Sequence, residues 1–119
     1  MDVVLKGRGI KITDQIRHTT EHKLGKIARL DPRVGRLEIE IMGDLNPRMG
    51  ASHRVEVACA RGRKTFRAYG EGSDVESALD QVEERLQRQI TSFRAKRRRF
   101  LRRGRRQPPA ETEELGPLT

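Results

Sequence analysis

The side chains best suited to metal binding or nucleophilic catalysis are His18, His22 and Cys59. His18 and His22 are four residues apart, so one face of a helix would carry both of them. A zinc site needs a third ligand, and the sequence "HTTEH" lacks the glutamate placement of the "HExxH" motif. Cys59 is predicted on the inward side of a strand, where a free thiol packs as a small apolar group. We therefore expect no metal, no cofactor and no enzymatic activity.

A block of basic residues near the end of the chain indicates a function more clearly. Residues 94–106, "RAKRRRFLRRGRR", contain nine Lys and Arg residues and no acidic residue. The other 106 residues carry 17 basic and 17 acidic side chains, so this block accounts for the whole net charge of +9. Such a block indicates nucleic-acid binding, although a solubilising tail or a targeting signal has a similar composition. Only 3% of the residues are aromatic, so we expect electrostatic and shape-based recognition rather than base stacking.

Length and composition limit the architecture that can position these residues. The chain has 119 residues, of which 34% are hydrophobic, which predicts one domain with a small aliphatic core. No apolar run approaches the ~20 residues of a membrane span, and no secretory signal is apparent. A single cysteine excludes an internal disulfide and fits the cytoplasm. We expect a domain at residues 1–100, followed at 101–119 by a basic stem end and a Pro/Glu-rich tail that resembles the start of a linker.

Hydrophobic periodicity gives the order of the elements. Alternating apolar residues predict strands, and apolar residues three or four positions apart predict helices. The predicted elements are, in order, a strand at 1–7, a helix at 14–30, strands around 37–41, 55–59 and 66–71, and a long helix that begins after Ser73 or Asp74 and has an apolar stripe as far as Phe93. Two short links make the strands candidates for antiparallel pairing. The fold class is therefore α+β, in the order β-α-β-β-β-α, with both helices on one face of a four-stranded sheet.

Basic residues recur on one side of each predicted helix. Lys23 and Lys26 share a face of the first helix. Five positions share a face of the second helix, namely Arg85, Arg88, Lys96, Arg99 and Arg103. If the two helices lie side by side, these stripes could form a positive groove of a width that suits phosphates.

Two segments resemble the ribosome hibernation promoting factor / protein Y family of ribosome-associated translation inhibitors. The first is "GRGIKITDQIRHTTEHKLGKIARL", and the second is "GEGSDVESALDQVEERLQRQI" with its Leu-x-Arg-Gln-aliphatic end. The resemblance covers about residues 1–98 and corresponds to the N-terminal domain of the family. It implies a fold similar to a double-stranded-RNA-binding domain, in agreement with the predicted element order. Glu76 departs from the pattern, because well-known members have an aromatic residue there.

The resemblance also implies a function, which is to bind the decoding cleft of the small ribosomal subunit. There the domain would block the mRNA and tRNA sites and keep idle ribosomes inactive in stressed or stationary-phase cells. The partners would be the small subunit with its rRNA and ribosomal proteins, without a membrane, and long members dimerise ribosomes through a further C-terminal domain. The positions matched to rRNA contacts are Arg17, Lys23, Lys26, Arg85, Arg88 and Lys96. Charge density alone adds Arg94, Arg97, Arg98 and Arg99.

Two other functions remain compatible with the sequence. One is general binding of structured RNA, although an ordinary double-stranded-RNA-binding module would have a lysine-rich cluster at the start of the last helix, where this chain has Asp74 and Glu76. A ribosome-assembly protein would also use a basic helical stem.

Overall fold

A computed structural model describes residues 2–43 and 52–106. The elements are β1 (Asp2–Arg8), α1 (Asp14–Leu30), β2 (Val34–Met42), β3 (His53–Arg61), β4 (Lys64–Gly72) and α2 (Val75–Arg106). The chain forms two compact units, Met1–Gln87 and Arg88–Thr119, and the boundary between them falls within α2. Among the described residues, no helix is long and apolar enough to cross a membrane.

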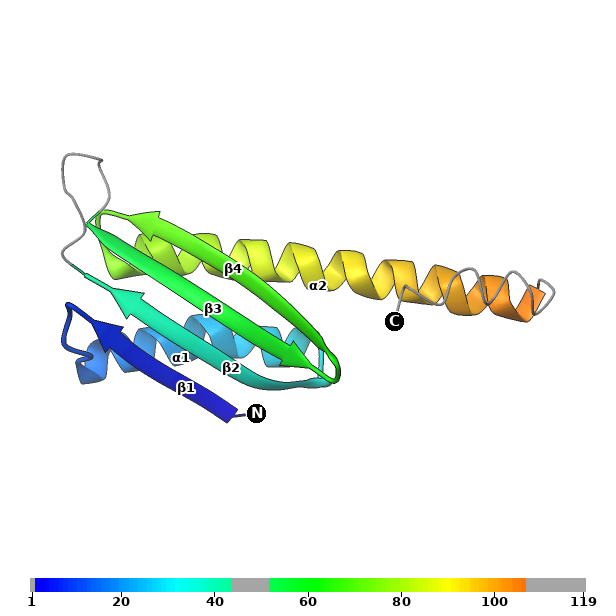
Figure 1. The fold of residues 1–119 in the computed structure, drawn as a ribbon, viewed down its shortest axis with the longest axis horizontal. Helices are drawn as coiled ribbons and strands as arrows, with labels where there is room; N and C mark the ends of the chain where they lie inside the picture. Colours follow the sequence, from blue (N-terminus) through cyan, green and yellow to red (C-terminus); the bar gives the residue numbers. More distant parts are fainter. Residues whose placement is uncertain (1, 44–51, 107–119) are drawn as a thin grey trace. The chain divides into compact units, whose positions relative to one another are not determined.

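The first unit is built on a four-stranded sheet in the order β1-β2-β3-β4. β2, β3 and β4 are antiparallel neighbours, as their short links predict. β1 instead pairs parallel to β2, because the chain crosses over through α1 between these two strands and re-enters the sheet in the same direction. Both α1 and the first turns of α2 cover one face of the sheet (Figure 1). The predicted α+β fold and its element order are confirmed.

Side-chain caps fix the ends of both helices. The Thr13 hydroxyl accepts a hydrogen bond from the Ile16 amide at 3.1 Å and begins α1. Asp74, one of the two predicted caps, accepts from the Ser77 amide at 2.7 Å, and this bond lowers the pKa of the Asp74 carboxyl. α1 ends at Leu30, as the following Asp-Pro sequence predicts.

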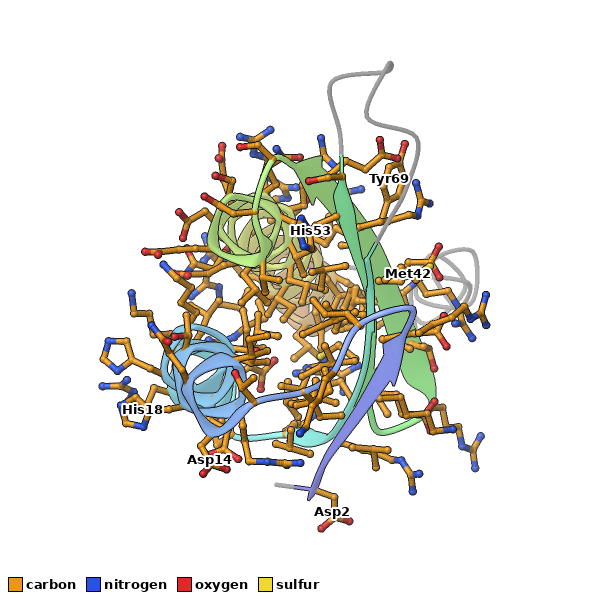
Figure 2. All side chains as sticks on the ribbon, turned by 90° about the vertical axis from the view of Figure 1, so that its left-hand side faces the viewer. Asp2, Asp14, His18, Met42, His53 and Tyr69 are labelled. Atoms are coloured by element: carbon orange, nitrogen blue, oxygen red, sulfur yellow. The ribbon has the colours of Figure 1, made fainter. Side chains whose placement is uncertain are left out.

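The core lies between the helices and the covered face of the sheet (Figure 2). Its fully buried members in the first unit are aliphatic and include Leu24, Ile27, Leu37, Ile41, Val55, Leu79, Val82 and Leu86. One ion pair is buried beside them: Arg61 Nε donates to Asp31, whose other carboxylate oxygen accepts from the Arg33 amide at 3.0 Å. The sequence pattern indicates only a helix stop at Asp31, so it does not predict this pair.

Candidate nucleic-acid interface

The second unit presents the basic block on a continuous helix. From Arg88 to Arg106 the helix contains no acidic residue. Lys96, Arg98, Arg99 and Arg102 are exposed, while Arg94 and Arg97 are partly buried. Within the described residues, none of Lys96, Arg98 and Arg99 takes part in an ion pair. The side chain of Arg103 lies outside the described part of the chain.

Local sequence explains why this block is helical. Arg, Lys, Gln and Leu are good helix formers, and the segment has no proline and no glycine before Gly104. Cations near the C-terminal end of a helix also complement the helix dipole. Like charges four residues apart repel one another, however, and no acid on this part of the helix offsets them. The result is a strong positive field that an anionic partner would stabilise.

Lys23 and Lys26 lie in the first unit and connect the two helices. Lys23 Nζ lies 2.5 Å from an Asp80 carboxylate oxygen and 3.8 Å from Glu76. Lys26 Nζ lies 3.4 Å from Glu83. The hydrogen bond to Asp80 raises the pKa of Lys23 above its ordinary value. Both lysines therefore fasten α1 to the acidic first turns of α2.

These ion pairs correct the expected groove between two basic stripes. The side of α2 that meets α1 in the first unit is acidic and carries Asp80 and Glu83. Arg85 does not join Lys23 and Lys26 there, because its Nη1 donates to the Tyr69 carbonyl oxygen of β4. Within the first unit, α1 and α2 therefore do not form a groove between two basic stripes. Periodicity places residues on a face of a helix but does not say which neighbour that face meets.

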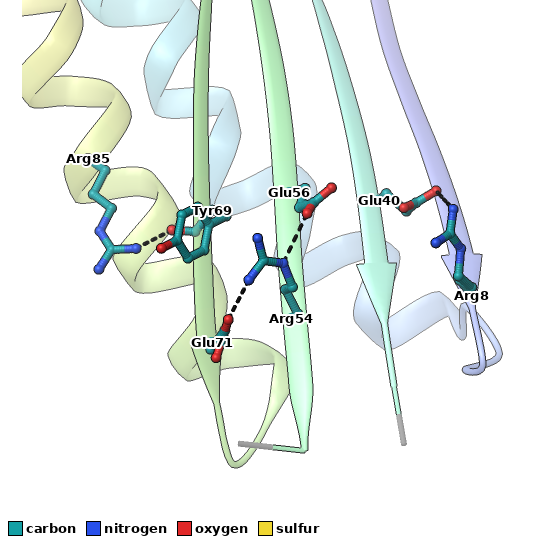
Figure 3. A network of polar contacts seen from close by, with 7 residues as sticks. All are labelled: Arg8, Glu40, Arg54, Glu56, Tyr69, Glu71 and Arg85. Atoms are coloured by element: carbon teal, nitrogen blue, oxygen red, sulfur yellow. Dashed lines mark hydrogen bonds and ion pairs between the residues drawn. The ribbon is translucent and has the colours of Figure 1, made fainter. Parts of the chain in front are cut away.

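A polar cluster around Tyr69 forms where Arg85 reaches the sheet (Figure 3). The guanidinium carbons of Arg54 and Arg85 lie 4.1 and 5.4 Å from the centroid of the Tyr69 ring. Arg54 Nε also pairs with Glu56 at 2.9 Å, and its Nη1 pairs with Glu71. Strand alternation could have placed these side chains on the uncovered face, but the register that joins them comes only from the structure.

The remaining candidates on α1 are exposed to solvent, and the cysteine is buried in the core. Arg17, His18 and His22 are exposed on α1, and His18 points away from the sheet (Figure 2). Across the described residues, no three His, Cys, Asp or Glu side chains gather in a way that could hold a metal ion. Cys59 is buried, and loss of hydration raises the pKa of its thiol to about 11. A thiol with this pKa stays protonated near neutrality and is a poor nucleophile.

Comparison with known proteins places residues 3–98 in a recognised family. The family model described as sigma 54 modulation protein / S30EA ribosomal protein matches residues 3–98. The ribosome hibernation promotion factor of Lactococcus lactis subsp. cremoris (strain MG1363) is 30% identical over 95 residues. That alignment covers 80% of this chain and 50% of the relative, so the chain spans about half the length of the curated relative that it matches.

Two solved structures share the fold. A ribosomal subunit interface protein from Coxiella burnetii superposes with a TM-score of 0.70 at 22% identity, over 80% of this chain and 99% of that one. The N-terminal domain of Thermus thermophilus Protein Y gives a TM-score of 0.67 at 28% identity, over 78% of this chain and 99% of that domain.

Proposed function

Because the chain belongs to the sigma 54 modulation protein / S30EA ribosomal protein family, we propose that it is a ribosome hibernation factor. It binds the small ribosomal subunit at the decoding cleft, contacts rRNA, and blocks the mRNA and tRNA sites while it is bound. The similarity to a ribosome hibernation promotion factor from Lactococcus lactis and to a ribosomal subunit interface protein from Coxiella burnetii supports ribosome binding. The small-subunit cleft as the place of binding is our proposal.

The observation that carries this proposal is the acid-free basic helix from Arg88 to Arg106. Phosphate contacts supply most of the affinity for nucleic acid, and each one requires an accessible Lys or Arg side chain. Lys96, Arg98 and Arg99 are exposed and meet this requirement, as does Arg17 on α1. Arg88, Arg94 and Arg97 lie on the same helix and add to its positive charge. Lys23, Lys26 and Arg85 contribute less, because each already has a partner within the protein.

Co-sedimentation with purified small subunits at increasing KCl tests the proposal. If about six phosphates are neutralised, the log–log slope of affinity against salt is about −4 to −5. The triple variant Lys96→Gln, Arg98→Gln, Arg99→Gln should lose about 2 to 3 from the magnitude of that slope. A matched control removes the same charge elsewhere, through Lys11→Gln, Arg33→Gln and Arg63→Gln, which are all exposed.

Equal slopes for the wild type and the triple variant would contradict the proposal. Equal affinity of the wild type for ribosomal subunits and for an unrelated RNA duplex would instead favour a general structured-RNA-binding protein.

A further inference from the structure

The face of the sheet that neither helix covers, which we call the outer face, differs in charge from the basic helix. Its side chains alternate with those of the core along all four strands. Its charged members are five basic and five acidic residues, namely Asp2, Lys6, Arg8, Arg36, Glu38, Glu40, Arg54, Glu56, Arg67 and Glu71. The net charge of the outer face is therefore zero.

Much of this charge is already paired within the protein. Arg8 lies 3.3 Å from Glu40, and Arg54 contacts both Glu56 and Glu71 (Figure 3). Arg36 lies 3.0 Å from Glu38. A phosphate that approached these arginines would compete with the carboxylates and would be repelled by them. The outer face consequently lacks the cation excess that binding to RNA requires.

The centre of the outer face is hollowed. A depression of about 470 Å³ opens there, and its lining includes Val4 from β1, Ala58 from β3 and Tyr69 from β4. Ala58 lies on a central strand, where its small side chain leaves room above the sheet. A mixed apolar and polar hollow of this kind can receive side chains from a partner.

Tyr69 is a preformed anchor at the side of this hollow. It is 50% exposed, yet its ring lies 4.1 Å from the Arg54 guanidinium, and its carbonyl oxygen accepts from Arg85. A side chain that is already held loses little rotamer freedom on binding. Tyrosine and arginine are also the residue types that most often dominate the energetics of protein–protein interfaces.

We propose that the outer face is a docking surface for a ribosomal protein, whose side chains enter the hollow beside Tyr69. This inference rests on the proposed ribosome binding and assigns the protein component of the ribosome to a separate surface of this chain, the outer face. The basic helix meets rRNA, and the neutral outer face meets a protein surface of low net charge. Charge favours protein over RNA at this face, because the strand side chains of the outer face carry no excess of cations, whereas the basic helix does.

Site-specific photo-crosslinking tests this assignment on the ribosome. A diazirine-bearing phenylalanine, which inserts into both protein and RNA, replaces Tyr69 in one variant and Lys96 in another. After irradiation of complexes with purified small subunits, we expect an adduct from position 69 that protease removes and that mass spectrometry identifies as a ribosomal protein. We expect an RNase-sensitive adduct from position 96.

An RNA adduct from position 69, or no adduct from position 69 while position 96 forms its adduct, would overturn the outer-face proposal and leave the proposed function intact.

A hollow-filling pair gives an independent measurement. Ala58→Trp places an indole in the hollow, and Ala60→Trp makes the same change two residues further along the same face, outside the lining of the hollow. We expect Ala58→Trp to weaken binding to small subunits about tenfold or more, as for loss of a central interface contact. Ala60→Trp should change it less than about threefold, and both should bind protein-free rRNA like the wild type. Equal loss in both variants, or loss of binding to protein-free rRNA, would contradict docking of a protein in the hollow.

Discussion

Individual side chains in this protein divide into those with a partner inside the fold and those without one. Lys23 pairs with Asp80 and Glu76, whereas Lys96 has no ion-pair partner among the residues that the structure describes. In the sequence, both lysines match positions expected to contact rRNA. Their surroundings predict different contributions to RNA binding.

A comparison of single neutral substitutions measures that difference. Lys96→Gln should reduce the magnitude of the salt slope for small-subunit binding by about 1, as expected for loss of one phosphate contact. Lys23→Gln should leave the slope nearly unchanged, because Asp80 already neutralises this ammonium group. The measurement is fluorescence anisotropy at several KCl concentrations. A larger slope change for Lys23→Gln than for Lys96→Gln would mean that ribosome binding breaks the pair with Asp80.

Cys59 gives a pH-dependent prediction. Burial raises the pKa of its thiol from an ordinary 9.0 to about 11. The unfolded chain therefore loses this proton first as the pH rises, so stability is complete below pH 9 and declines between pH 9 and 11. The stability advantage of the wild type over Cys59→Ser, measured by urea unfolding, should shrink by about 2 to 3 kcal/mol across this window. A constant difference between the two proteins would show that the thiol ionises equally in both states.

At the scale of elements, β4 and α2 approach each other closely at Gly70. A Cβ atom on Gly70 would overlap the Ala78 carbonyl oxygen and lie 2.9 Å from the Gln81 Cβ atom. The neighbour is helix backbone, which cannot move aside without disturbing the packing of α2. Gly70 is therefore a requirement of packing and not of turn geometry.

Two glycine substitutions should change stability in opposite directions. Gly70→Ala should destabilise the protein by about 1 to 3 kcal/mol, as overpacking does. Gly25→Ala, in the middle of α1 with nothing within 4 Å of the added methyl group, should stabilise it by about 0.5 to 1 kcal/mol. Chemical denaturation of both variants checks the signs. Stabilisation by Gly70→Ala would mean that β4 and α2 are further apart than the structure places them.

Sequence predicts the elements better than it predicts their contacts. Apolar periodicity and the caps at Thr13 and Asp74 are local signals, so the order β-α-β-β-β-α and the helix starts follow from them. The parallel pairing of β1 and the buried pair of Asp31 with Arg61 depend on residues that are far apart in the chain. The candidate site follows the same rule. The basic block is visible as composition, but the acidic lining between α1 and α2 appears only when the helices are packed.

Considered as a whole molecule, the chain separates two kinds of surface. All of the net charge comes from residues 94–106, and the outer face of the sheet is neutral. This separation allows one protein to face RNA with one part and protein with another. Under the proposed function, inhibition of translation requires only that the chain stay bound. Each bound molecule would then silence the one ribosome that it occupies.

Titration of a cell-free translation reaction tests this central claim most directly. The ribosome concentration is fixed well above the dissociation constant, and protein is added in steps, with the variant Lys96→Gln, Arg98→Gln, Arg99→Gln as the control. We predict that synthesis falls linearly and stops near one wild-type molecule per ribosome, that added initiation complex competes, and that the variant requires a large excess. Complete inhibition at far less than one molecule per ribosome would contradict occupancy and would indicate turnover.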